Sequence, residues 1–352
     1  MTTFSKKDVD TLTYSDTGDG ALQLSFDPFV LTTGMFTPGA AASFCARIPD
    51  EDRRRLGFAE LSYYRGDVET AHKEFDALQN SDALSTVTAA MLGRAIASFS
   101  LGEPKELLEM YRRAREINNG FEEGSPFRKM TDLFLLYFNV LIRNLPEIVF
   151  PAVGVGAFNV PDSLKPMAFY CYTYYLLAAG DIGRAIGMAE GALIFAERPC
   201  PVSEIYLCMN IATGYTMRLL WDKAEYYFRY AWELAKPDGL IMPFAEHRGS
   251  LSGLLERCLR YQEPEAYRRI LAMSNRYHKG WAYVHNLITG DQIADRLTAI
   301  EYNVASLVAK GLSNTQTAEI LGITVNSVRT HLRNIFNKLD VTGRKELKKY
   351  VI

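Results

Sequence analysis

The chain has 352 residues, which is enough for two or more domains that each bury a core. Apolar residues make up 48% and charged residues 23%, so the composition is that of an ordinary globular protein and argues against global disorder. Residues 297–352 hold eight Lys or Arg and four Asp or Glu, a net charge of +4, whereas the other residues sum to −6. A basic end on an acidic body indicates one local surface for a polyanion.

Membrane, secreted and enzymatic classes are not indicated. The longest uncharged apolar stretches, 133–142 and 166–180, are shorter than the roughly 18 residues that a membrane span needs, and no apolar signal segment opens the chain, so we expect a cytoplasmic protein. The five cysteines are scattered, which favours reduced, buried thiols. No catalytic spacing, metal cluster or phosphate loop is evident, so neither an enzyme nor a cofactor nor a metal is predicted. The adjacent pair Glu246 and His247 is interpreted as a surface pair.

The N-terminal segment, residues 1–55, differs from the rest of the chain. Its stretch 20–38 alternates briefly between apolar and polar residues and then runs into Pro and Gly. This pattern is compatible with a short strand or with a loop. In either case we expect residues 1–55 to pack on the helical repeats that begin at residue 56.

From 56 to 276 the apolar residues follow helical periods, and several segments share one layout of two helices joined by a turn. These segments are 56–78, 88–117, 167–196 and 204–235, with turns at Gly66-Asp67, Gly102-Glu103, Gly180-Asp181 and Trp221-Asp222. A fifth unit has a helix at 128–143, but the prolines and glycines of 146–161 interrupt its partner. The turns recur about every 36 to 42 residues, as in helix-pair arrays. The segments loosely resemble tetratricopeptide repeats, which implies a concave surface for a peptide, a protein or a small molecule.

Eight tyrosines in these segments either line a ligand groove or fill the core, and the core is favoured for any one of them. They are Tyr63, Tyr64, Tyr170, Tyr172, Tyr174, Tyr175, Tyr226 and Tyr227. The run 170–175 must present tyrosine on more than one helix face, so we expect at least one to look out of the core. Residues 277–296 are predicted to be a connector.

The last 56 residues predict short capped helices. Thr298 with Glu301, and Ser313 with Gln316, have the spacing of two capping boxes, and Thr324 caps a third helix. Each cap contributes roughly 1 kcal/mol. The third helix carries an apolar seam at Val325, Val328, Leu332, Ile335 and Leu339. A fourth helix is expected over 344–352.

The opposite face of the third helix is polar and basic, the arrangement of a helix-turn-helix. We predict base contacts from Arg329, Thr330 and Arg333, since Arg donates two hydrogen bonds to guanine and Thr meets a thymine methyl. Predicted contacts to the DNA backbone are Ser313, Asn314, Thr324, Asn326, Ser327, His331, Lys338, Arg344 and Lys345. An ordinary solvated face is the alternative, but residues 324–339 lack acidic side chains.

Residues 297–352 resemble the DNA-binding domain of LuxR/NarL-type bacterial transcription regulators. The resemblance is carried by LTAIE, the GLSN turn, AEILGI, SVRTHLRNI, KLDV and Arg344. It implies that the third helix reads the major groove, and that Leu347 and Tyr350 of the fourth helix form a homodimer on DNA. The chain departs from the family at Ile300, Thr317 and Ile320. We therefore expect the second helix to be slightly turned or to touch the helical body.

The sequence thus predicts an all-α protein, a tetratricopeptide-like helix-pair array (56–276) followed by a four-helix LuxR-type domain (297–352). The predicted function is a sequence-specific transcription regulator that binds double-stranded DNA and whose repeats sense a ligand or partner. The alternative is a helical-repeat adaptor that binds a protein and has lost DNA binding. No receiver-type acidic pocket and no GxxxxGK[ST] loop precede the terminal domain.

Overall fold

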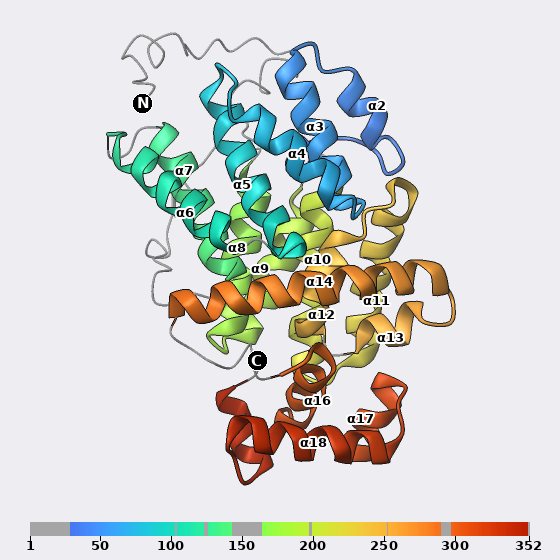
Figure 1. Cartoon of the computed structure of the whole chain (residues 1–352). Helices are drawn as coiled ribbons and strands as arrows, with labels where there is room; N and C mark the ends of the chain where they lie inside the picture. The colour runs from blue at the N-terminus through green and yellow to red at the C-terminus, as the bar shows by residue number, and fades with distance from the viewer. Residues whose placement is uncertain are drawn as a thin grey trace.

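The computed structural model describes residues 29–102, 104–122, 126–142, 164–196, 199–251, 253–289 and 297–350. Every regular element in these ranges is a helix, so the all-α prediction is confirmed. The helices enclose a large core in the body and a smaller, separate core in the C-terminal domain. Figure 1 shows the C-terminal domain at one end of the body.

The body begins with α2 (Ala41–Ala46), α3 (Glu51–Tyr64), α4 (Val68–Leu78), α5 (Leu84–Leu101), α6 (Pro104–Asn119) and α7 (Pro126–Leu141). It continues with α8 (Lys165–Ala178), α9 (Ile182–Ile194), α10 (Pro201–Met217), α11 (Trp221–Ala235) and the 3-10 helix η4 (Lys236–Asp238). It ends with α12 (Met242–Leu251), α13 (Leu254–Leu259) and α14 (Pro264–Thr289). The C-terminal domain consists of α16 (Ala299–Ala309), α17 (Asn314–Leu321), α18 (Val325–Leu339) and the 3-10 helix η5 (Arg344–Lys349).

The turns that join the helix pairs lie where glycine allows them. Gly66, Gly102 and Gly180 have φ values of +84°, +77° and +84°, in the left-handed region that favours glycine. The fourth turn comes slightly earlier than predicted, because Trp221 is already the first residue of α11 and Leu219 takes a φ of +59°. Successive helices from α3 to α11 pack on one another. The specific likeness to tetratricopeptide repeats stays a prediction, and segment 146–161 lies outside the described residues.

The described part of the N-terminal segment is irregular apart from α2 and the first five residues of α3, and it packs on the body, whereas residues 1–28 lie outside the described ranges. The backbone N–H groups of Val30, Leu31 and Thr32 donate to the carboxylate of Glu60 at 2.8, 2.8 and 3.1 Å. Burial raises the pKa of Glu60 to about 7, although these three donors act to lower it. Residues 29–40 therefore form a loop that packs on α3, and they do not form the strand that was the other possibility.

The expected connector 277–296 is wrong over residues 277–289, because these residues form the second half of α14. Their apolar side chains Tyr277, Trp281 and Val284 are buried in the body core. The Trp281 indole also donates to the carbonyl of Leu141 at 2.7 Å. A helix with this much buried surface is a structural part of the body rather than a link.

Four of the eight tyrosines considered as core filler are buried. Tyr63, Tyr64, Tyr170 and Tyr172 are each less than 8% exposed. In the run 170–175, Tyr174 and Tyr175 are only half-buried, as expected, and outside it Tyr227 is half-buried while Tyr226 is exposed. The core interpretation therefore holds for the four buried tyrosines.

The interpretation of Glu246 and His247 as a surface pair is wrong. His247 is 3% exposed, and its Nδ1 and Nε2 lie 2.8 Å from the Pro243 carbonyl and 3.1 Å from the Tyr170 hydroxyl. Glu246 accepts a hydrogen bond from the Tyr206 hydroxyl at 2.8 Å. Both residues stand on α12, which is packed between α10 and α14 and has little free surface.

All five cysteines are buried and none forms a disulfide. Within the described ranges, no helix combines the length and apolar character that crossing a bilayer requires.

Candidate nucleic-acid interface

The first helix of the C-terminal domain, α16, begins with the predicted capping box. The Thr298 hydroxyl accepts from the Glu301 N–H, and the Glu301 carboxylate accepts from the Thr298 N–H at 2.8 Å. The same carboxylate is 4% exposed and accepts a hydrogen bond from Lys338 at 2.6 Å. Burial acts to raise the pKa of Glu301, but the bonds from Lys338 and Thr298 outweigh it and lower the pKa overall. Glu301 therefore fixes α16 to the end of α18.

Caps also set the tight turn between α17 and α18. Ser313 and Gln316 form the second predicted capping box at the start of α17. The helix ends at Gly322, which has a φ of +62°. Two residues later the Thr324 hydroxyl accepts from the Ser327 N–H at 3.0 Å and starts α18. These local signals place α17 and α18 in helix-turn-helix order.

The two faces of α18 are separated as predicted. Its apolar side chains Val328, Leu332, Ile335 and Leu339 are buried against α16 and α17, and Val325 is half-buried. Arg329, Thr330 and Arg333 are exposed on the other side. In Figure 1, α18 lies at the outer edge of the domain, with α16 between it and the body. The base-reading candidates are thus brought together on one free face.

The residues predicted to contact the DNA backbone fall into three groups: residues of the helix caps, residues hydrogen-bonded to neighbours in the domain, and the remaining three. Ser313, Thr324 and Ser327 take part in the helix caps described above, close to the free N–H groups of the first turns. Asn326 accepts a hydrogen bond from Arg329 at 3.3 Å, and Asn314 accepts one from Arg344. Arg344 also donates to the Leu312 carbonyl at 3.2 Å. The remaining candidates are Lys338, which is paired with Glu301, Lys345, which is exposed, and half-buried His331.

The structure corrects the role expected of Leu347. Its side chain is fully buried in the core of its own domain, so it is not on a surface that a second chain could reach. Tyr350 is half-buried and packs against the same core. The expected fourth helix is the short 3-10 helix η5 in the described residues. The short η5 helix packs on α16 and buries Leu347, which the sequence analysis assigned to contact with a second chain.

The second helix touches the helical body, as the departures at Thr317 and Ile320 predicted. Thr317 and Ile320 are both buried, and α17 packs on α13. Arg260, just after α13, donates to the Gly322 carbonyl at 2.9 Å. A Cβ atom added to Gly253 would lie only 2.3 Å from Cγ2 of Ile320, which shows how closely the two segments approach.

Sequence reasoning missed two residues that hold the domain against the body. Arg260 and Trp221 come from the body, and Trp221 packs against both cores. Lys338 was expected on DNA but is paired with Glu301, 37 positions earlier. None of these contacts has a local spacing signal that could have revealed it. Among the described residues, no group of three or more His, Cys, Asp or Glu side chains is placed to hold a metal ion.

Comparison with known proteins identifies the domain. Residues 295–351 match the family described as "Bacterial regulatory proteins, luxR family". A relative from Vibrio campbellii, "HTH-type transcriptional regulator MalT", is 26% identical over 141 residues, covering 36% of this chain and 16% of the relative. The protein of the same description from Yersinia pestis is 30% identical over 129 residues, covering 32% of this chain and 14% of that protein.

The match to these curated relatives thus spans 16% or less of their length. No solved structure matches the chain. The family match and the exposed reading face agree in position and in architecture. The C-terminal part of this chain is a LuxR-family helix-turn-helix domain, and its relatives are MalT-type transcription regulators.

Proposed function

We propose that this chain is a sequence-specific DNA-binding transcription regulator that inserts α18 into the major groove. The observation that carries the proposal is the free face of Arg329, Thr330 and Arg333 on a helix whose other side is buried. α18 contains no acidic residue, so its two exposed arginines face DNA without a carboxylate of the same helix beside them. The match to a family of bacterial regulators supports the same reading.

The proposed roles follow the geometry. Arg329 and Arg333 lie one helical turn apart, so their guanidinium groups can donate to base edges one after the other along the groove. Thr330 lies between them and can contact a thymine methyl. Asn326 of α18 and Lys345 of η5 are exposed and are proposed to contact phosphates, which fix the register of the helix.

Two further parts of the proposal concern partners. We propose that two chains bind one palindromic site, as dimeric helix-turn-helix proteins do. We also propose that the helical body senses an effector, since a stack of helices offers an extended surface for one. The adaptor alternative has no specific observation in its favour.

The test begins with selection of binding sites from random duplex DNA. Arg333→Ala is then compared with wild type on the selected site, and Arg268→Ala serves as the control. Arg268 is exposed on α14, and its Nε donates to the Pro264 carbonyl of the same helix at 3.2 Å. Both variants therefore remove one exposed positive charge.

We expect Arg333→Ala to lose about 1–3 kcal/mol of binding free energy and to relax selectivity at one base position, with Arg268→Ala close to wild type. Equal affinity of Arg333→Ala and wild type would contradict the assigned role. Failure to select any site would instead favour the adaptor.

A further inference from the structure

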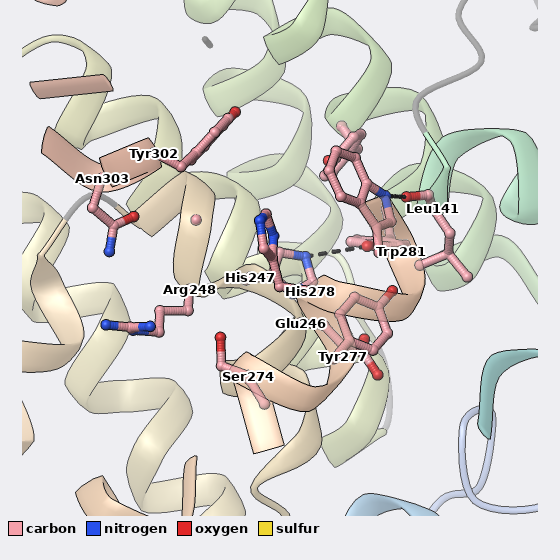
Figure 2. A pocket seen from close by; sticks show the side chains of 14 residues that line it. Leu141, Glu246, His247, Arg248, Ser274, Tyr277, His278, Trp281, Tyr302 and Asn303 are labelled. Carbon is pink, nitrogen blue, oxygen red and sulfur yellow. Dashed lines mark hydrogen bonds between the residues drawn. The ribbon is translucent and has the colours of Figure 1, made fainter. Parts of the chain in front are cut away.

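A cavity lies where the body meets the C-terminal domain, and both contribute to its walls. Its empty volume, open solvent included, is about 670 Å³. Arg248 of α12, Ser274, His278 and Trp281 of α14, and Tyr302 and Asn303 of α16 line it. Figure 2 shows the Asn303 amide and the Arg248 guanidinium on one side of the view and the Trp281 ring on the other. A molecule bound here would touch the body and the DNA-binding domain at once.

One part of the wall is aromatic. The ring of His278 stacks on that of Trp281, with centroids 5.7 Å apart and planes 24° from parallel. The ring of Tyr302 follows at 6.3 Å from His278. The ring of His285 also stacks on Trp281, with centroids 4.9 Å apart and planes 14° from parallel, so Trp281 is covered by two histidines. A planar ligand would therefore pack against Tyr302, whose plane is tilted by 53° from that of His278.

Two other residues that line the cavity carry buried polar atoms without a hydrogen bond among the described residues. Asn303 is 1% exposed, and neither its amide nitrogen nor its amide oxygen has a partner in the described part of the chain. The Arg248 Nε atom is buried and lacks a partner within the same ranges. Buried polar groups of this kind are rare in native proteins unless a ligand or water satisfies them. The cavity is therefore bordered by one amide and one guanidinium N–H that make no hydrogen bond among the described residues.

The charge of the site points to a neutral ligand. Arg248 is 6% exposed and already forms an ion pair with Glu256 at 3.3 Å, which is itself 5% exposed. An anion would thus meet a compensated positive charge. A carboxamide such as that of Asn303 is complemented by a planar edge with one donor beside one acceptor, as in its pairing with adenine.

We propose that this cavity binds a small neutral heterocycle with adjacent hydrogen-bond donor and acceptor, of the nucleobase class, held by Asn303 and Arg248. Its ring packs against Tyr302. The inference deepens the proposed function, on which it rests, by assigning an effector class and a site to the sensing role. Asn303 stands two residues from Glu301, which ties α16 to α18, so an occupied site would fasten the reading helix to the body.

The test is calorimetric titration of the full chain with adenine, guanine, uracil and xanthine, with benzoate as an anionic planar control. We expect at least one nucleobase to bind and benzoate not to. Asn303→Leu removes both amide atoms at similar volume and should weaken that binding at least tenfold. Asn286→Leu is the matched control, because Asn286 also has an unsatisfied amide among the described residues but does not line the cavity.

The proposal is overturned if none of the four nucleobases binds, or if Asn303→Leu binds as tightly as wild type. Asn303→Ala replaces the leucine variant if the latter does not fold. DNA affinity of the ligand-free chain for its selected site is measured separately. Nucleobase binding without DNA binding would contradict the proposed function, whereas DNA binding without nucleobase binding would contradict only this site.

Discussion

The contact between the body and α17 makes a sharp prediction for Gly253→Ala. Gly253 precedes α13 with a φ of +94°, and an added Cβ would lie 2.3 Å from Cγ2 of Ile320. Ordinary contacts of a Cβ atom begin at 3.4 Å, so α17 and the Gly253 backbone must separate by about 1 Å. The χ1 angle of Ile is stiff in a helix, so a rotamer change does not relieve the overlap.

The expected loss of stability has two parts. A residue other than glycine at this φ costs roughly 1–2 kcal/mol. Overpacking against Ile320 adds about 1–3 kcal/mol. Gly311→Ala isolates the first part, since Gly311 has a φ of +96° and its added Cβ meets nothing within 4 Å. The difference between the two variants therefore measures the contact between the body and the C-terminal domain.

The measurement is urea unfolding of wild type, Gly253→Ala and Gly311→Ala, together with hydrogen exchange of the α17 amides. We expect Gly253→Ala to lose about 1–3 kcal/mol more than Gly311→Ala and to show faster exchange in α17. If the two variants lose the same free energy and exchange alike, the packing of α17 on α13 cannot hold in solution.

Two further predictions concern the body. Burial raises the pKa of Glu246 from 4.5 to about 7, so between these pH values the folded chain keeps a proton that the unfolded chain releases. The free energy of unfolding should therefore fall as pH rises through this window, by ~3 kcal/mol at most. Urea unfolding at pH 5 and pH 8 should show a smaller fall for Glu246→Gln than for wild type. Identical pH slopes of the two proteins would contradict the assignment. Gly280→Ala places a Cβ 2.0 Å from the Phe99 carbonyl oxygen and should cost about 3 kcal/mol in thermal unfolding, whereas Gly187→Ala, with nothing within 4 Å, should gain ~0.5–1 kcal/mol. Equal effects of the two glycine variants would refute the close packing of α14 on α5.

The helix boundaries that sequence could predict are those with a local cause. Gly66, Gly102 and Gly180 end their helices because each adopts a positive φ that other residues avoid. The turn before α11 was misplaced because Leu219 takes a positive φ without a sequence signal. The second half of α14 was missed since Gly280 weakens a helical pattern, although here it allows the helix to lie directly on the backbone of α5.

In the candidate interface, too, contacts with a local sequence cause could be predicted and contacts that depend on packing could not. The caps at Thr298 and Ser313 join residues three apart, so their spacing can be read from the chain. The pairing of Lys338 with Glu301 depends on how α16 and α18 pack, which no local pattern encodes. Leu347 was misassigned because an apolar residue on a short helix can serve a dimer or its own core, and only the packing decides between them.

The placement of the C-terminal domain limits how the body can act on DNA binding. The body contacts the domain through α16 and α17, while Arg329 and Arg333 stay exposed on α18. A signal received by the body therefore has no need to uncover the reading face. Since Glu301 links α16 to α18, a change in the position of α16 on the body moves α18 with it. Under the proposed function, regulation would act on the orientation of α18, and hence on the spacing of two such helices across a palindromic site.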